Sequence, residues 1–281
     1  MLSGDAETDA GTLDAWASER TGGLIERMPV AVRRDTVLVL ASALALRLKW
    51  IRPFSPGCPE LTEGPWTGRE VRGLYHETAL LDRVRVARTP AGPVTLLEVV
   101  GDTGVDVHLV LGEPGGVLAG GIAAATRTIP ATGASLLPEG EPGPGLSIAT
   151  VASGSREPRL SVETVAFSVD ADHDLLHQAA LFGLRSASDV RSGHFPGISG
   201  TPLAVGSARQ VAVARFGAEG FEAAAVTAAG LAVGCAEPRL AYRVRHAEVR
   251  FHRPFRFAAV HRTSRLVLAA GWVNDPAIVA G

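Results

Sequence analysis

Two histidines at helical spacing are the side chains of this sequence best placed to do chemistry. The stretch HDLLH sets His173 and His177 four residues apart, the spacing at which the zinc-binding helix of metalloproteases carries its two ligands. That chemistry needs a glutamate after the first histidine as general base, and Asp174 is one methylene shorter. We therefore interpret the pair as solvent-facing histidines on the first turns of an ordinary helix, with a zinc hydrolase as the distant alternative.

Other catalytic and cofactor motifs are missing from the sequence. It contains no G-x-S-x-G elbow and no Walker loop, and the stretch GEPGGVLAGG has neither the lysine of a Walker loop nor the spacing of a dinucleotide fingerprint. Cys58 and Cys235 are the two cysteines, too few for a disulfide framework or a four-ligand zinc site. We predict that the protein is not an enzyme and uses neither a cofactor nor a metal.

A run of small residues, GAEGFEAAAVTAAG at 217–230, has a composition suited to a switch rather than to catalysis. It has no three-to-four apolar stripe that would seat a helix on a core, although alanine favours helices. In a strand, alternate side chains would face the core and solvent in this order: Phe221, Ala223, Ala225 and Thr227 inward, and Glu222, Ala224 and Val226 outward. Small inward residues suit a strand that enters a packed sheet, and Gly220 would give the backbone freedom. An exposed flexible loop is the alternative.

Composition limits the partners and the compartment. The chain has 281 residues, 46% hydrophobic and 20% charged, enough for one large or two ordinary domains. A formal charge of −2 gives no electrostatic reason to expect nucleic acid or an anionic membrane. The start, MLSGDAETDAG, is acidic where a secretory signal is basic and then apolar, so the chain as written would be cytoplasmic.

Periodicity predicts the elements that position these residues. Residues 12–28 read as an amphipathic helix with a threonine N-cap, and residues 174–183 as a helix ending at Gly183. Residues 36–48 are an apolar core segment, too short to span a membrane, that fits helix or strand, and residues 52–73 are a loop. Strands are expected at 95–100, 105–111, 256–260 and 266–272.

Several stretches, in order along the chain, resemble the serpin family of serine protease inhibitors. They are RDTVLVLASALALRLKWIRPF (34–54), HDLLHQAALFGL (173–184), HFPGIS (194–199), the run at 217, and FHRPFRFAAVHRTSRLVLAAGWVNDP (251–276). The resemblance implies an α+β fold of mixed sheets with packed helices. It also implies a reactive-centre loop, cleaved by a target protease and then inserted as a strand of the main sheet. Residues 217–250 would be the hinge and reactive-centre loop region.

The resemblance also carries residue roles, with departures from the family pattern. Phe221 stands where inhibitory members have a small residue, which we expect to slow insertion. Ala218 stands where the family has an acidic residue, and Ala166 stands where it has the lysine that pairs with it. Losing both partners of this ion pair destabilises the fold less than losing one, because no unpaired charge is left. The resemblance assigns three residues to the sheet-opening region: Ser42, Trp50 and Gln210. It places the scissile bond between Gly234 and Cys235, with Arg239 as the less favoured site.

The family has several helices and a strand before the helix at 12–28, where this chain has eleven residues. We therefore interpret it as a bacterial serpin-like protein lacking the N-terminal helices, one domain over 1–281 with a tail at 1–11. The expected function is suicide-substrate inhibition of a serine or cysteine protease by a monomer. The alternative is a non-inhibitory binding or scaffold protein. A signal peptide on a missing N-terminus would make it extracellular.

Overall fold

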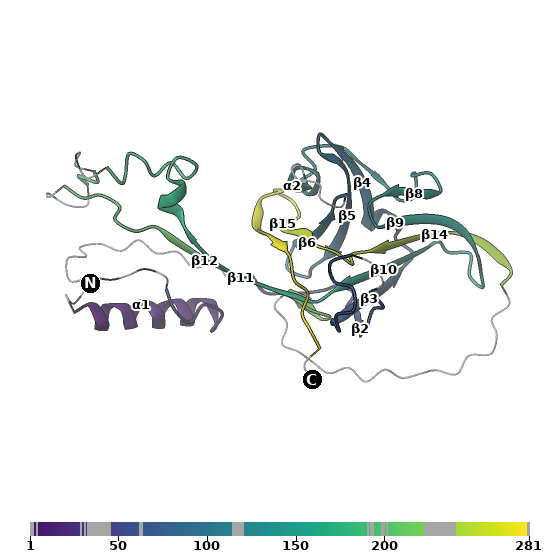
Figure 1. Cartoon of the computed structure of the whole chain (residues 1–281), viewed down its shortest axis with the longest axis horizontal. Coiled ribbons are helices and arrows are strands. Elements are labelled where there is room, and N and C mark those ends of the chain that lie inside the picture. Colours follow the sequence, from purple (N-terminus) through teal and green to yellow (C-terminus); the bar gives the residue numbers. More distant parts are fainter. Residues whose placement is uncertain are drawn as a thin grey trace. The chain divides into compact units, whose positions relative to one another are not determined.

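The computed structural model describes residues 3, 5–28, 30, 32, 46–61, 64–113, 121–189, 191, 194–197, 200, 202–221 and 240–279. These residues fall into two compact units (Figure 1), one from within 1–46 and 170–213 and the other from within 47–169 and 214–281. The expectation of one domain over 1–281 stays a prediction, and each unit is described by itself.

The first unit contains the helix α1, Ala6–Thr21. It begins six residues earlier than the predicted helix at 12–28, because Asp5 rather than a threonine is the N-cap and accepts the Thr8 amide at 2.8 Å. It ends at Gly22, which takes the left-handed conformation (φ 61°) while Gly23 donates to Ser18 O at 2.8 Å. Its buried residues, Asp9, Ala17 and Thr21, are four or eight residues apart and so lie on one face of the helix, where Leu13 is half-buried.

The predicted helix at 174–183 is also wrong. His173 lies in strand β11, Phe167–Asp174, and only the 3-10 turn η2, Leu175–Gln178, follows it. Asp174 caps this turn by accepting the Leu176 amide at 2.9 Å. Leu181 and Phe182 are 77% and 48% exposed, so these two side chains contribute little apolar packing that would stabilise a longer helix.

The second unit contains two six-stranded sheets. The first is antiparallel throughout, in the order β16-β15-β6-β5-β4-β7. Its strands are β4 (Val84–Thr89), β5 (Gly92–Val100), β6 (Val105–Leu111), β7 (Ala131–Gly133), β15 (Phe255–His261) and β16 (Val267–Val273). The short helices η1 (Leu81–Arg83) and α2 (Gly121–Ala125) contact this sheet. The four strands predicted from alternation and from the GDTG turn are thereby confirmed, as β5, β6, β15 and β16.

The second six-stranded sheet is mixed, in the order β2-β3-β10-β14-β9-β8. Its strands are β2 (Ser55–Gly57), β3 (Gly73–Thr78), β8 (Gly140–Gly143), β9 (Leu146–Ser153), β10 (Arg159–Val165) and β14 (Tyr242–Arg250). β10 and β14 pair in parallel and the other neighbours are antiparallel. The predicted loop at 52–73 is confirmed apart from β2 and the first residue of β3.

A four-stranded sheet, in the order β1-β13-β12-β11, completes the set. Its other strands are β1 (Leu48–Lys49), β12 (Arg209–Phe216) and β13 (Gly220–Phe221). Leu48 is the described end of the predicted apolar segment at 36–48, and most of that segment lies outside the described residues.

An aromatic cluster packs the core of the second unit where the sheets meet. Phe167 stacks on Phe216 with ring centroids 5.1 Å apart and meets Phe255 edge-on at 5.7 Å. Phe257 and Phe251 extend the cluster, and all five rings are at most 2% exposed. Because each buried aromatic ring contributes a large apolar area, this cluster fixes how the strands that bear it pack.

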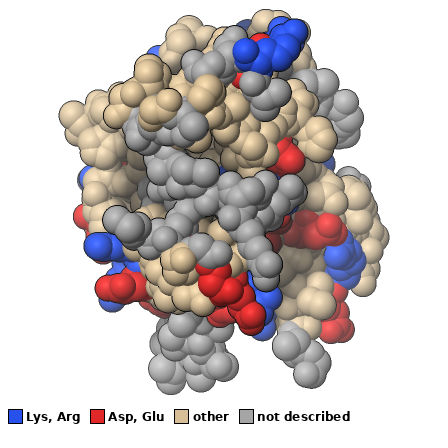
Figure 2. All heavy atoms as spheres, turned by 90° about the vertical axis from the view of Figure 1, so that its left-hand side faces the viewer, with Lys and Arg blue, Asp and Glu red and all other residues tan. Residues whose placement is uncertain are grey.

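The molecular surface has no large region of one charge sign on the face shown in Figure 2, where basic and acidic side chains are interspersed. None of the described helices is both long enough and apolar enough to cross a bilayer.

His108, on β6, gives the fold a testable acid sensitivity. It is fully buried, and desolvation lowers the pKa of its ring from 6.5 to about 4, against a smaller opposing effect of Glu98. Between pH 6.5 and 4 the His108 ring is therefore protonated in the unfolded chain but neutral in the folded chain, so the free energy of unfolding falls as the pH drops from about 7 towards 4. A shift of this size corresponds to about 3 kcal/mol. His108→Leu should lose less stability than the parent between pH 7 and pH 4.5 in urea unfolding.

His177→Gln is the matched control, because that ring is 84% exposed. Equal losses of stability in the parent and in His108→Leu would contradict the burial of a neutral imidazole.

Candidate functional site

Residues Gly217–Phe221, called here the hinge hairpin, reverse the chain at the end of β12. The Gly217 amide donates to Gly220 O at 3.0 Å, and Phe216 and Phe221 are paired across the turn. The chain therefore leaves β12 and comes straight back alongside it.

The returning strand β13 has a neighbour on each side. Phe221 pairs with Leu48 and Gly220 with Lys49 of β1, also antiparallel. β13 thus lies between β1 and β12, an internal position of the sheet rather than an edge. In this register a strand continuing beyond Phe221 would run between the residues that precede Phe216 and those that precede Leu48.

Gly220 is required by the closeness of β1 rather than by an unusual backbone angle. A Cβ at this position would lie 2.2 Å from Leu48 O and 3.1 Å from Lys49 Cα. Its φ is not in the left-handed region, so the structure shows a steric reason for glycine here, and the expected role as a source of backbone freedom stays a prediction.

Trp50 and its neighbours hold the hinge hairpin by its backbone. The indole Nε1 donates to Gly217 O at 2.9 Å, and the Trp50 amide donates to Glu219 O at 2.9 Å. The Phe54 amide donates to Ala218 O, also at 2.9 Å. Three successive carbonyls are therefore satisfied by one short segment, and the Trp50 ring, 4% exposed, packs on Phe216 with centroids 4.9 Å apart.

Phe221 is accommodated by a hydrophobic site beneath the sheet. Its side chain is 2% exposed and its ring lies 5.9 Å from that of Phe257 on β15. The expectation that Phe221 slows insertion stays a prediction, and the ring itself already occupies an inward position in this structure. Burying it stabilises the seated strand by roughly 1.5–3 kcal/mol.

Most of the other predicted site residues stay predictions. Glu222–Thr227, Gly234, Cys235, Arg239 and Ser42 lie outside the described residues. Gln210 lies near the start of β12 and is exposed. Ala166 and Ala218 engage through their backbones alone, Ala166 with Arg72 and Ala277, and Ala218 with Phe54.

The two histidines do not form a zinc-binding helix. His173 is on β11 and His177 is in η2, where its ring is 84% exposed and 3.8 Å from Asp174. Within the described part of the chain, no three His, Cys, Asp or Glu side chains come together as metal ligands do.

The arrangement matches solved structures along nearly its whole length. Covering 96% of this chain, thyroxine-binding globulin in complex with thyroxine is 17% identical, with a TM-score of 0.65. A serpin from the trematode Schistosoma haematobium is 14% identical over 98% of the chain, with a TM-score of 0.64. Serpin48 from the insect Tenebrio molitor is 17% identical over 96%, with a TM-score of 0.60.

The chain has the serpin fold. Residues 149–276 match the family model described as Serpin (serine protease inhibitor), whereas no curated protein matches the sequence. The α+β serpin-like fold predicted from the sequence is thereby confirmed. The chain spans 65% of the length of each of these three serpin-fold structures.

Trp50→Phe should loosen the hinge hairpin without removing the aromatic contact. The phenyl ring cannot donate to Gly217 O, so one hydrogen bond worth about 0.5–1.5 kcal/mol is lost together with part of the packing. We expect destabilisation by about 1–3 kcal/mol in urea unfolding and faster limited proteolysis after residue 216.

Trp272→Phe is the control, since Trp272 is 41% exposed on β16. If both variants were cleaved at the same rate and at the same places, Trp50 would not hold the hairpin.

Proposed function

We propose that this chain is a serpin-like inhibitor that a serine or cysteine protease cleaves within residues 222–239. The observation that carries the proposal is the position of β13 between β1 and β12, with the chain beyond Phe221 leading into the run of small residues. The start of that run thus already occupies the place that an inserted strand would fill.

Insertion is favourable because the strand gains hydrogen-bonding partners on both sides. Each hydrogen bond contributes about 0.5–1.5 kcal/mol net, so ten or so further residues would add several kcal/mol. The first inward residue, Phe221, is already buried. The next inward residues, Ala223, Ala225 and Thr227, are small and need little space in the sheet.

The chemical step takes place on the protease. Its nucleophile attacks the carbonyl carbon of Gly234, the bond to the Cys235 nitrogen breaks, and that nitrogen takes up a proton and leaves as the amine. The acyl group stays on the protease. If the loop inserts before water hydrolyses the acyl bond, an ester with serine or a thioester with cysteine, the covalent complex is trapped. If insertion is slow, hydrolysis releases the cleaved chain and active protease. The less favoured bond after Arg239 would suit a trypsin-like protease but would make the inserted segment longer.

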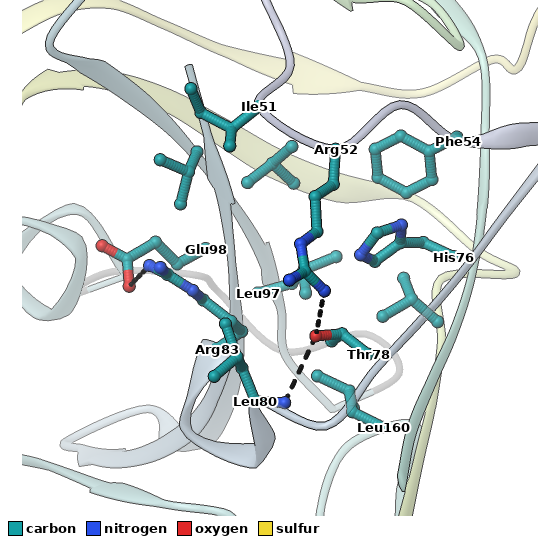
Figure 3. A pocket seen from close by; sticks show the side chains of 13 residues that line it. Ile51, Arg52, Phe54, His76, Thr78, Leu80, Arg83, Leu97, Glu98 and Leu160 are labelled. Atoms are coloured by element: carbon teal, nitrogen blue, oxygen red, sulfur yellow. Dashed lines mark hydrogen bonds and ion pairs between the residues drawn. The ribbon is translucent and has the colours of Figure 1, made fainter. Parts of the chain in front are cut away.

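A non-inhibitory binding protein is the second candidate, and a cavity favours it. The cavity has a volume of about 250 Å³ and is lined by apolar residues of β5 and β10 and by polar ones: Arg52, His76, Thr78, Arg83 and Glu98. Arg52 Nη1 donates to Thr78 Oγ1 at 3.3 Å (Figure 3). Arg52 has no carboxylate within ion-pair distance among the described residues, so an amphipathic anion would suit it. The matched globulin is named for binding thyroxine, and small-molecule binding by this chain rests on the cavity.

Cleavage followed by heating separates the two candidates. Chain nicked between residues 222 and 239 should melt far above the intact chain if the loop inserts. Gly220→Ala should reduce this gain, since the added Cβ would lie 2.2 Å from Leu48 O and displace β13. The same variant should form less covalent complex with a protease that cleaves the loop, measured on denaturing gels.

Gly206→Ala is the control, because a Cβ there meets nothing within 4 Å. A melting temperature that nicking leaves unchanged in the parent and in both variants would overturn insertion and leave the binding protein as the better candidate.

A further inference from the structure

One buried carboxylate in the second unit is surrounded by three arginines. The side chain of Glu98, on β5, is 8% exposed. Its Oε2 lies 3.1 Å from Arg83 Nη1 and 3.5 Å from Arg85 Nη2, and its Oε1 lies 3.8 Å from Arg127 Nη2. Figure 3 shows the Arg83–Glu98 pair at one end of the neighbouring cavity.

Positive charge is in excess at this cluster. Three guanidinium groups face the single carboxylate of Glu98, and Asp82 is the one other acidic residue of the adjoining hollow. His108, the cross-strand partner of Glu98, adds little charge, because burial lowers its pKa to about 4. Even with Asp82 counted, the charges do not cancel.

Arg85 is the least satisfied member of the cluster. Its Nε and Nη2 atoms are enclosed and make no hydrogen bond among the described residues. Burial lowers the pKa of Arg85, Glu98 opposes this, and the nearby Arg127, Arg265 and Arg83 lower it further. A second negative charge above this guanidinium would therefore be stabilising.

The arginines open onto a hollow that can hold a ligand. The hollow has a volume of about 600 Å³ and is lined by Arg83, Arg85, Arg127, Ser135 and Leu80, among others. The side chains of Arg83 and Arg127 are 36% and 51% exposed, so their remaining N–H groups are accessible to a ligand. The Arg85 side chain is more buried than either and contributes its positive charge. Planar guanidinium groups bind oxyanions with paired, charge-assisted hydrogen bonds.

Arg127 occupies a backbone position that suits glycine better. Its φ is 62°, and its amide donates to Ala124 O at 3.0 Å, as at the end of a helical turn. A non-glycine residue in the left-handed region is strained. The side chain held at this strained position places its Nη2 atom 3.8 Å from Glu98 Oε1 and lines the hollow.

We propose that this hollow is an anion site that binds a phosphate or sulfate group between Arg83 and Arg127, above Arg85. The site is independent of the proposed protease inhibition, since it contains no residue of the hinge hairpin. The oxyanion can be free or the end group of a small ester, and the two sources share the same contacts.

The test is calorimetric titration of the whole chain with inorganic phosphate, inorganic sulfate and glycerol phosphate, at constant ionic strength in chloride. Arg127→Gly removes one guanidinium and also relieves the left-handed strain, so it should fold at least as stably as the parent in chloride. We expect it and Arg83→Ala to bind phosphate at least tenfold more weakly than the parent. Tighter binding of glycerol phosphate than of phosphate would identify an ester as the preferred source, and the reverse a free ion.

Arg88→Ala is the matched control, because Arg88 lies on β4 like Arg85 but is exposed and does not line the hollow. Phosphate and sulfate stabilise all proteins to a degree by exclusion from their surface, which would raise the melting temperature of every variant alike. An absence of binding heat with the parent, or equal affinities in the parent, Arg83→Ala and Arg127→Gly, would overturn the proposal.

Discussion

The close approach of Gly220 to the backbone of β1 is the constraint on which the candidate site depends. Any side chain larger than hydrogen would meet Leu48 O, so β13 can lie between β1 and β12 only because this residue is glycine. Once β13 is seated, the Phe221 ring reaches Phe257, and the carbonyls of the hinge hairpin face the donors of Trp50 and Phe54. The beginning of the proposed reactive loop is therefore a packed structural element.

The parts of the fold that could be predicted from the sequence are those fixed by local pattern. The hairpin of β5 and β6 follows from two β-branched runs around GDTG, and β15 and β16 from similar alternation. The first helix was predicted correctly in kind but not in extent, because Asp5 and Gly22 set the ends of α1. The helix predicted at 174–183 is wrong, and Leu181 and Phe182 within it are largely exposed. The three-residue strand β2 carries Ser-Pro-Gly, which no strand pattern identifies.

The site was only half predictable, because its decisive contacts are between residues far apart in the chain. Trp50 was identified, but its bond to Gly217 O gives no signal, since any residue supplies a carbonyl. The sequence suggested that Phe221 slows insertion, but it could not show the hydrophobic contact that the ring makes with Phe257, thirty-six residues later. The cluster at Glu98 draws one arginine each from η1, from β4 and from the turn after α2, and no spacing rule joins all three.

Hydrogen exchange measured residue by residue on intact and loop-cleaved chain tests the central claim most directly. If β13 is the seated beginning of an inserting strand, the amides of Gly217, Trp50 and Phe54 should be protected before cleavage, because each donates within or to the hinge hairpin. After cleavage they should stay protected while exchange along Arg209–Phe216 slows. Rapid exchange of these three amides in the intact chain, or exchange along Arg209–Phe216 that cleavage leaves unchanged, would contradict the account.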